Sequence, residues 1–124
     1  RMKNAQELQE TTMRLQQLQS YLQAIEEQLQ EVTGAIESID ELQGITQESE
    51  MYAPVAEGVY VKATLDKKKE YLINVGENIT IKKQPEDIKK MLQEQLDDLQ
   101  NVQDDLVKQF TESYQRYAQL QMDG

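Results

Sequence analysis

A seven-residue apolar repeat in the first third of the chain is the strongest constraint on what the chain can fold into. From Leu15 to Ile39, apolar side chains are separated by alternating steps of three and four residues without a break. This spacing places them on one stripe of an α-helix, whereas the residues between them are mostly Gln, Glu, Ser and Thr. The stripe comprises Leu8, Leu15, Leu18, Leu22, Ile25, Leu29, Val32, Ile36 and Ile39. The repeat predicts a coiled-coil helix over residues 1–44, ending at Gly44.

A second helix of similar length is predicted over residues 85–123. Pro85 suits a first helical turn, and the acidic residues that follow it complement the positive end of a helix. The apolar positions are Ile88, Leu92, Leu96, Leu99, Val102, Leu106, Phe110, Tyr117 and Leu120. Polar residues interrupt this repeat, and the step from Leu106 to Phe110 breaks its alternation. Because the two arms are equally long, we expect them to pair as an antiparallel hairpin.

The segment between the arms, residues 51–83, predicts four short strands in two hairpins. "VYVKATL" alternates between apolar and polar residues, and "MYAPV" before it is a candidate edge strand because it contains Pro54. Gly76-Glu77-Asn78 is predicted as the tight turn of the second hairpin. The polar segment with Lys67-Lys68-Lys69 is predicted as a solvated turn. The fold class is therefore mainly α, a long coiled-coil hairpin with two central β-hairpins.

Each hairpin is expected to carry one apolar face and to leave backbone groups unpaired at its edges. Edges of this kind invite pairing with another chain, so the segment is predicted to be an assembly module. The residues predicted at the assembly interface are Val59, Val61, Ala63, Leu65, Tyr71, Ile73, Val75, Ile79 and Ile81. The alternative is that the helices of the same chain cover this face.

Charge and composition exclude several classes of function. The formal net charge is -10, divided as -5 in residues 1–44, zero in 45–84 and -5 in 85–124, so acidic arms would repel nucleic acid. The chain has no Cys and no His, which removes thiol and imidazole chemistry. The acidic pairs Asp97-Asp98 and Asp104-Asp105 do not converge on a helix surface. We expect no enzyme activity, no metal and no cofactor.

The absence of a long apolar run also predicts no membrane span, and no apolar signal-peptide core is evident near the start. We therefore expect a cytoplasmic protein.

The order of helix, double hairpin and helix resembles the α-class subunits of prefoldin. The resemblance covers nearly the whole chain and is most specific from Pro54 to Lys83, in "APVAEGVYVKATLDKKKEYLINVGENITIKK". Two hairpins rather than one distinguish the α class from the β class. This chain departs from the family after Pro54, where members tend to be glycine-rich and this sequence keeps only Gly58.

The resemblance implies a molecular chaperone subunit that works without ATP. It implies that two α-class and four β-class subunits join their hairpins into a β-barrel platform, and that the coiled-coil tips hold unfolded polypeptides for delivery to a group II chaperonin. The candidate client-binding residues at the arm ends are Met2, Ala5, Leu8, Tyr114, Tyr117, Leu120 and Met122. For Leu8, Tyr117 and Leu120 the alternative is that they only continue the apolar stripe. For Met2 and Met122, which lie off the stripe, the alternative is a disordered tail.

A second interpretation of the whole chain is a coiled-coil scaffold or adaptor. Such a protein would also assemble through its hairpins, but it would recognise one folded partner rather than unfolded chains.

Overall fold

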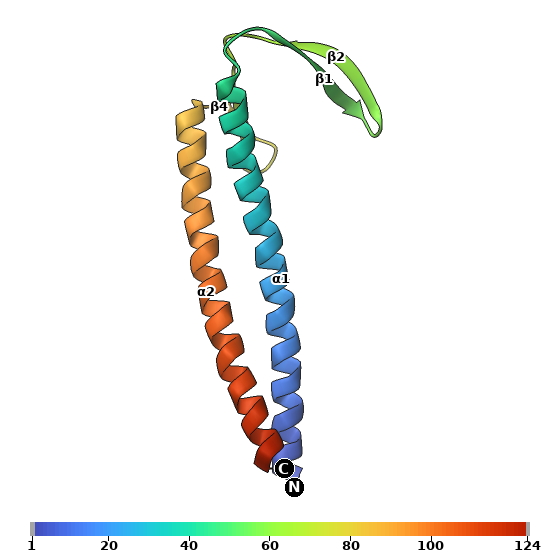
Figure 1. Cartoon of the computed structure of the whole chain (residues 1–124), viewed down its shortest axis with the longest axis vertical. Helices are drawn as coiled ribbons and strands as arrows, with labels where there is room; N and C mark the ends of the chain where they lie inside the picture. The colour runs from blue at the N-terminus through green and yellow to red at the C-terminus, as the bar shows by residue number, and fades with distance from the viewer. Residues whose placement is uncertain (1, 124) are drawn as a thin grey trace. The chain divides into compact units, whose positions relative to one another are not determined.

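A computed structural model describes the backbone of residues 2–123 and the side chains of residues 3–123. The elements follow the order α1 (Met2–Gly44), β1 (Ser49–Ala56), β2 (Val59–Leu65), β3 (Leu72–Asn74), β4 (Thr80–Lys82) and α2 (Pro85–Asp123) (Figure 1). The chain divides into two compact units. Unit 1 contains residues 1–33 and 94–124, and unit 2 contains residues 34–93.

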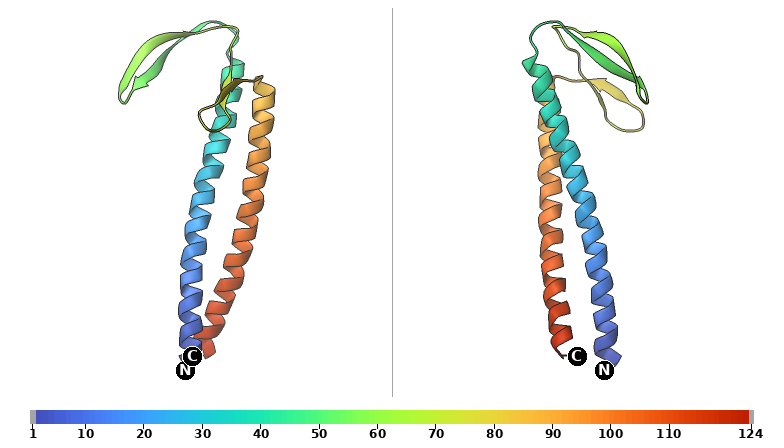
Figure 2. Two further views of the ribbon diagram at one scale, coloured as in Figure 1. Left: turned by 180° about the vertical axis from the view of Figure 1, so that it is seen from behind. Right: turned by 45° about the vertical axis from the view of Figure 1, so that its right-hand side comes forward.

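In unit 1, α1 and α2 lie side by side and run in opposite directions (Figures 1 and 2). Polar side chains join them at regular intervals. Arg116 Nε donates to Glu7 Oε1 at 2.7 Å, and Arg14 Nη2 donates to Gln109 Oε1 at 2.7 Å. One heptad along α1 therefore matches one heptad in the reverse direction along α2, as expected for a regular antiparallel coiled coil.

The apolar seam of α1 is confirmed at every predicted position. Each of its members from Leu8 to Ile39 is buried or half-buried, and the residues between them are mostly exposed. Leu18, with 1 % of its surface exposed, and Val32 are the most deeply buried α1 residues of unit 1. The seam is narrow, so few residues of this unit are fully removed from water.

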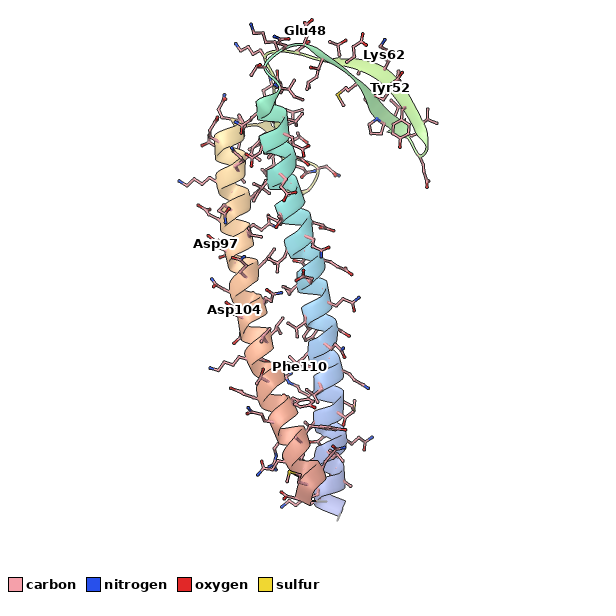
Figure 3. All side chains as sticks on the ribbon, viewed as in Figure 1. Glu48, Tyr52, Lys62, Asp97, Asp104 and Phe110 are labelled. Carbon is pink, nitrogen blue, oxygen red and sulfur yellow. The ribbon has the colours of Figure 1, made fainter. Side chains whose placement is uncertain are left out.

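The seam of α2 follows a different register from the predicted one. Val102 was predicted to lie in the seam, and this prediction is wrong because 46 % of its surface is exposed. The adjacent Gln103 is half-buried instead, and its Nε2 donates to Glu26 Oε2 on α1 at 3.1 Å. With Gln103 in the seam, the steps from Leu99 through Leu106 to Phe110 alternate as four, three and four residues. The predicted break at Phe110 is therefore absent, and Phe110 lies between the two helices (Figure 3).

In unit 2, the end of α1 and the start of α2 are joined in the same antiparallel sense. Lys89 Nζ donates to Asp40 Oδ1 at 2.9 Å, and Gln43 Nε2 donates to Glu86 Oε1 at 3.2 Å. Ile88 is buried here. Both polar contacts are exposed, so the burial of Ile88 contributes more to this junction than they do.

The strands form two separate antiparallel pairs, β1 with β2 and β3 with β4. The longer pair aligns Ser49 with Leu65 at one end and Ala56 with Val59 at the other, with an irregularity between Pro54 and Ala56. Pro54 lacks the N–H group that a regular ladder needs, which explains a bulge at this point. Gly58 has a φ of 75° and closes the turn.

The shorter pair, β3 with β4, ends in the predicted turn. Gly76 has a φ of 120°, a conformation that side chains disfavour, and Glu77 and Asn78 also have positive φ. The N–H of Ile79 donates to the carbonyl of Gly76 at 2.8 Å, and Asn74 Oδ1 accepts from the Gly76 N–H at 2.8 Å. These bonds fix the turn, since three-residue strands supply few ladder bonds of their own.

Candidate functional site: exposed apolar surfaces on the hairpins and arm ends

The β1–β2 hairpin has one continuous apolar face. Residues paired across an antiparallel ladder lie on the same face, and the pairs here include Met51 with Ala63 and Ala53 with Val61. We call this the apolar hairpin face. Its β2 members are the predicted assembly residues Val59, Val61, Ala63 and Leu65. Val59 and Val61 leave 52 % and 49 % of their surfaces exposed, so this face is largely open to solvent within the chain.

The opposite face of the same hairpin carries exposed tyrosines that the sequence analysis did not single out. Tyr60 pairs with Pro54, and Tyr52 pairs with Lys62 on the same side (Figure 3). Lys62 Nζ also lies 3.2 Å from Glu50 Oε2. Alternation already placed Tyr60 opposite to Val59, so extending the register to β1 would have revealed the cluster. The hairpin thus exposes apolar surface on both faces.

The predicted assembly residues of the second hairpin are arranged in the same way. Ile73 pairs with Ile81 across the ladder, and both are half-buried, as is Tyr71. Val75 and Ile79 flank the turn and remain about half exposed. The N–H of Val75 donates to the carbonyl of Ile79 at 2.9 Å, which holds these two residues together.

Every strand in this structure is an edge strand, because both sheets contain two strands. Each strand therefore presents an outer row of N–H and C=O groups with no ladder partner. Two-stranded sheets are marginally stable alone, and free edges beside apolar faces are typical of surfaces that pair with another chain.

The seven residues predicted at the arm ends fall into two groups. Leu8 and Tyr117 are half-buried, and Leu120 is buried with 3 % of its surface exposed, so these three continue the seam between α1 and α2. Ala5, Tyr114 and Met122 are exposed. The side chain of Met2 lies outside the described residues, although its backbone begins α1.

The exposed group leaves apolar side chains accessible near this end of unit 1. The rings of Tyr114 and Tyr117 have centroids 6.2 Å apart, so an exposed ring rests beside one that enters the seam. Met122 leaves 87 % of its surface exposed. Flexible methionine and amphipathic tyrosine side chains suit contacts with varied apolar partners.

The paired aspartates do not form a compact acidic site. Asp97 and Asp104 lie on the side of α2 that faces away from α1 (Figure 3). Asp105 Oδ2 accepts a hydrogen bond from Gln109 Nε2 at 2.7 Å. Within residues 2–123, no cluster of three acidic, His or Cys side chains is placed to hold a metal ion.

A comparison with protein families identifies the chain. The model of the prefoldin family, described as prefoldin subunit, matches residues 3–123. The chain belongs to the prefoldin family. Both hairpins, on which the predicted α-class resemblance depended, are present in this prefoldin.

Individual relatives agree with this assignment. Prefoldin subunit alpha of Thermofilum pendens is 26 % identical over 84 residues, which cover 68 % of this chain and 65 % of the relative. The match thus spans slightly less than two thirds of that relative's length. A subunit in the cryo-EM structure of filamentous PFD from Methanocaldococcus jannaschii superposes with a TM-score of 0.80, at 14 % identity, over 97 % of this chain and 99 % of the other.

These findings confirm the resemblance to α-class prefoldin and the predicted fold class of two long helices with two β-hairpins. Prefoldin is a chaperone family. No helix within residues 2–123 of this prefoldin is long and apolar enough to cross a bilayer.

Proposed function

We propose that this prefoldin subunit is part of a holdase that binds unfolded polypeptides and keeps them from aggregating. One observation carries the proposal. The β1–β2 hairpin exposes the apolar hairpin face, and both hairpins have strands with an unpaired edge. The paired helices expose further apolar side chains at Tyr114 and Met122. The first surface suits assembly and the second suits transient contact with clients.

The assembly that we propose is a hetero-hexamer of two α-class and four β-class subunits. Its hairpins would pair edge to edge into a barrel-like platform, which satisfies the unpaired backbone groups. Residues such as Val61 and Ile73 would then point into the shared core, and the half-exposed surface seen in the single chain would be covered.

Client binding in this proposal is multivalent. A single arm offers only a few exposed apolar side chains, among them Tyr114 and Met122, so each contact is weak. Several arms joined by one platform raise the effective concentration and strengthen binding by about 100-fold to 10,000-fold over one arm. The proposed cycle breaks no covalent bond of the client and uses neither ATP nor a catalytic group.

The same proposal includes delivery of the client to a group II chaperonin and a cytoplasmic location. Both parts of the proposal come from the family resemblance. Delivery also requires that the client be released, which agrees with weak, reversible contacts at the arm ends.

The test is light scattering of a chemically unfolded protein diluted into buffer with the assembled hexamer. One hexamer would carry Tyr114→Gln and Met122→Gln in this chain, which changes exposed positions and leaves the seam intact. A matched hexamer would carry Met91→Gln and Val102→Gln, which remove exposed apolar groups from other parts of α2.

We expect the unmodified and matched hexamers to suppress aggregation, and the arm-end variant to suppress it several-fold less. Equal suppression by all three would contradict the role of the arm end. If intact hexamers form and none of them suppresses aggregation, the holdase proposal is wrong.

A coiled-coil scaffold is the second candidate function. The observation in its favour is that the structurally similar PFD from Methanocaldococcus jannaschii is filamentous, which shows that this fold is compatible with open-ended assembly. Electron microscopy of the purified chain, alone and with a β-class partner, distinguishes a closed particle from a filament.

A further inference from the structure

Unit 2 contains a cavity of about 540 Å³ at the base of the β3–β4 hairpin. Three segments line it: the loop before β3, the end of β4 with the two residues after it, and the first turn of α2. The N–H of Lys83 donates to the carbonyl of Tyr71 at 3.2 Å, which holds the first two segments together. The charged residues that line the cavity are Lys68, Lys69, Lys82, Lys83, Glu70 and Asp87.

The cavity concentrates positive charge in a chain whose net charge is -10. Four lysines and two carboxylates line it, which gives a local charge of +2. The sequence analysis predicted a solvated turn for Lys67-Lys68-Lys69. The fold places Lys82 and Lys83 beside that turn, because β3 and β4 pair and bring the two ends of the hairpin together.

Two of the four lysines already have partners. Lys82 Nζ lies 3.0 Å from Glu70 Oε1, and Lys69 Nζ donates to the carbonyl of Ile45 just after the end of α1. The first contact joins β4 to the loop before β3, and the second joins that loop to the residue after α1.

Lys68 and Lys83 have no ion pair or side-chain hydrogen bond with any residue in 3–123. Lys83 is also half-buried as a residue. The positive end of the α2 dipole lies near Pro85, so the site also favours anions. A carboxylate that enters the cavity can therefore pair with the Lys68 and Lys83 ammonium groups without breaking an existing ion pair.

We propose that this cavity binds an acidic peptide segment of a partner protein, with Asp or Glu carboxylates contacting Lys68 and Lys83. The volume lies within the range of about 300–1,000 Å³ for ligand pockets, far more than one small ion needs. Lysine acts as a point charge, and no arginine lines the cavity to make the planar, bidentate contact that phosphate favours. The arms carry a charge of -5 each, which repels long polyanions such as nucleic acid more than a short peptide.

The proposal can be tested by fluorescence anisotropy with a labelled hexaglutamate peptide and the purified chain of residues 1–124. A glutamine peptide of the same length is the uncharged control, and inorganic phosphate and a single-stranded oligonucleotide are competitors. The variant is Lys68→Gln with Lys83→Gln, which removes two charges without breaking a contact described above. The matched control is Lys3→Gln with Lys108→Gln, which removes two exposed charges from unit 1.

We expect the unmodified chain and the matched control to bind hexaglutamate equally, and the cavity variant to bind it about tenfold more weakly. Raising the ionic strength from about 0.05 M to about 0.3 M should weaken binding to the unmodified chain, because screening shortens the reach of the lysine charges. The proposal is wrong if hexaglutamate does not bind, if both double variants lose the same affinity, or if phosphate or the oligonucleotide binds more tightly than the peptide. Circular dichroism of each variant confirms that its helices are intact.

Discussion

At the scale of single residues, very few side chains hold this structure together. Among residues 3–123, the buried apolar residues are Leu18, Val32, Ile88 and Leu120. A two-helix coiled coil cannot surround a side chain as a globular core does, so most seam residues remain partly exposed. The stability of the arms should therefore depend strongly on these few positions.

The first prediction concerns Leu18. Replacing it with alanine removes a side chain that is 1 % exposed and leaves a cavity, so we expect Leu18→Ala to lower the free energy of unfolding by about 2–5 kcal/mol. Met13 lies nearby on α1 but is exposed, so Met13→Ala should change stability by less than about 0.5 kcal/mol. Urea unfolding followed by circular dichroism measures both. Equal losses would show that the seam around Leu18 is not the source of stability.

At the scale of elements, the two helices differ in how well their sequences predict their packing. The seam of α1 was predictable because apolar residues occupy every position from Leu15 to Ile39. The seam of α2 was not, because Val102 and Gln103 compete for one position and hydrophobicity alone favours valine. Gln103 keeps the alternation of steps up to Phe110, and it donates a hydrogen bond to Glu26 of the other helix.

The hairpins were predictable for a similar reason, since alternation and the Gly76 turn are local signals. The tyrosines opposite the apolar hairpin face could be found only by extending the strand register from β2 to β1, and the lysines of the cavity only by aligning the two ends of the second hairpin. Both depend on which residues meet across a strand pair, and that register is not encoded in any single stretch of sequence.

The second prediction tests the polar seam position. Gln103→Leu should raise the free energy of unfolding by about 1 kcal/mol, because the replacement buries apolar surface in place of an exposed amide contact. Val102→Leu adds apolar surface one position away but outside the seam, so it should have little effect. Thermal unfolding of the two variants distinguishes them. A larger gain from Val102→Leu would mean that the predicted register, with Val102 in the seam, is correct.

At the scale of the whole molecule, the fold leaves apolar surface and strand edges exposed that a stable monomer would be expected to cover. Both sheets have free edges, and the apolar hairpin face is open although the apolar seam of the arms is closed. A chain of this kind is expected to gain stability from its partners, so its measured stability should rise with subunit concentration.

The third prediction separates assembly from folding. Val61→Lys places a charge on the apolar hairpin face, and we expect it to abolish assembly with a β-class partner because the ammonium group would be buried without a counter-ion. Thr64→Lys changes the same strand on its opposite, solvent-exposed face and should leave assembly intact. Native mass spectrometry reports the subunit composition. Helical content should be unchanged in both variants, and a hexamer formed by Val61→Lys would show that this face lies outside the interface.

The regular spacing of the contacts between the arms has a consequence for how such arms change in length. Glu7 with Arg116 and Arg14 with Gln109 repeat after one heptad on each helix, so removing one heptad from both helices leaves the remaining partners aligned. A matched deletion that is not a whole number of heptads rotates the seam away from its partner. The paired arms can therefore be shortened or extended only in increments of about 10 Å, since a helix rises about 1.5 Å per residue. Insertions or deletions in the arms of related chains should therefore be multiples of seven residues, and they should occur in both helices.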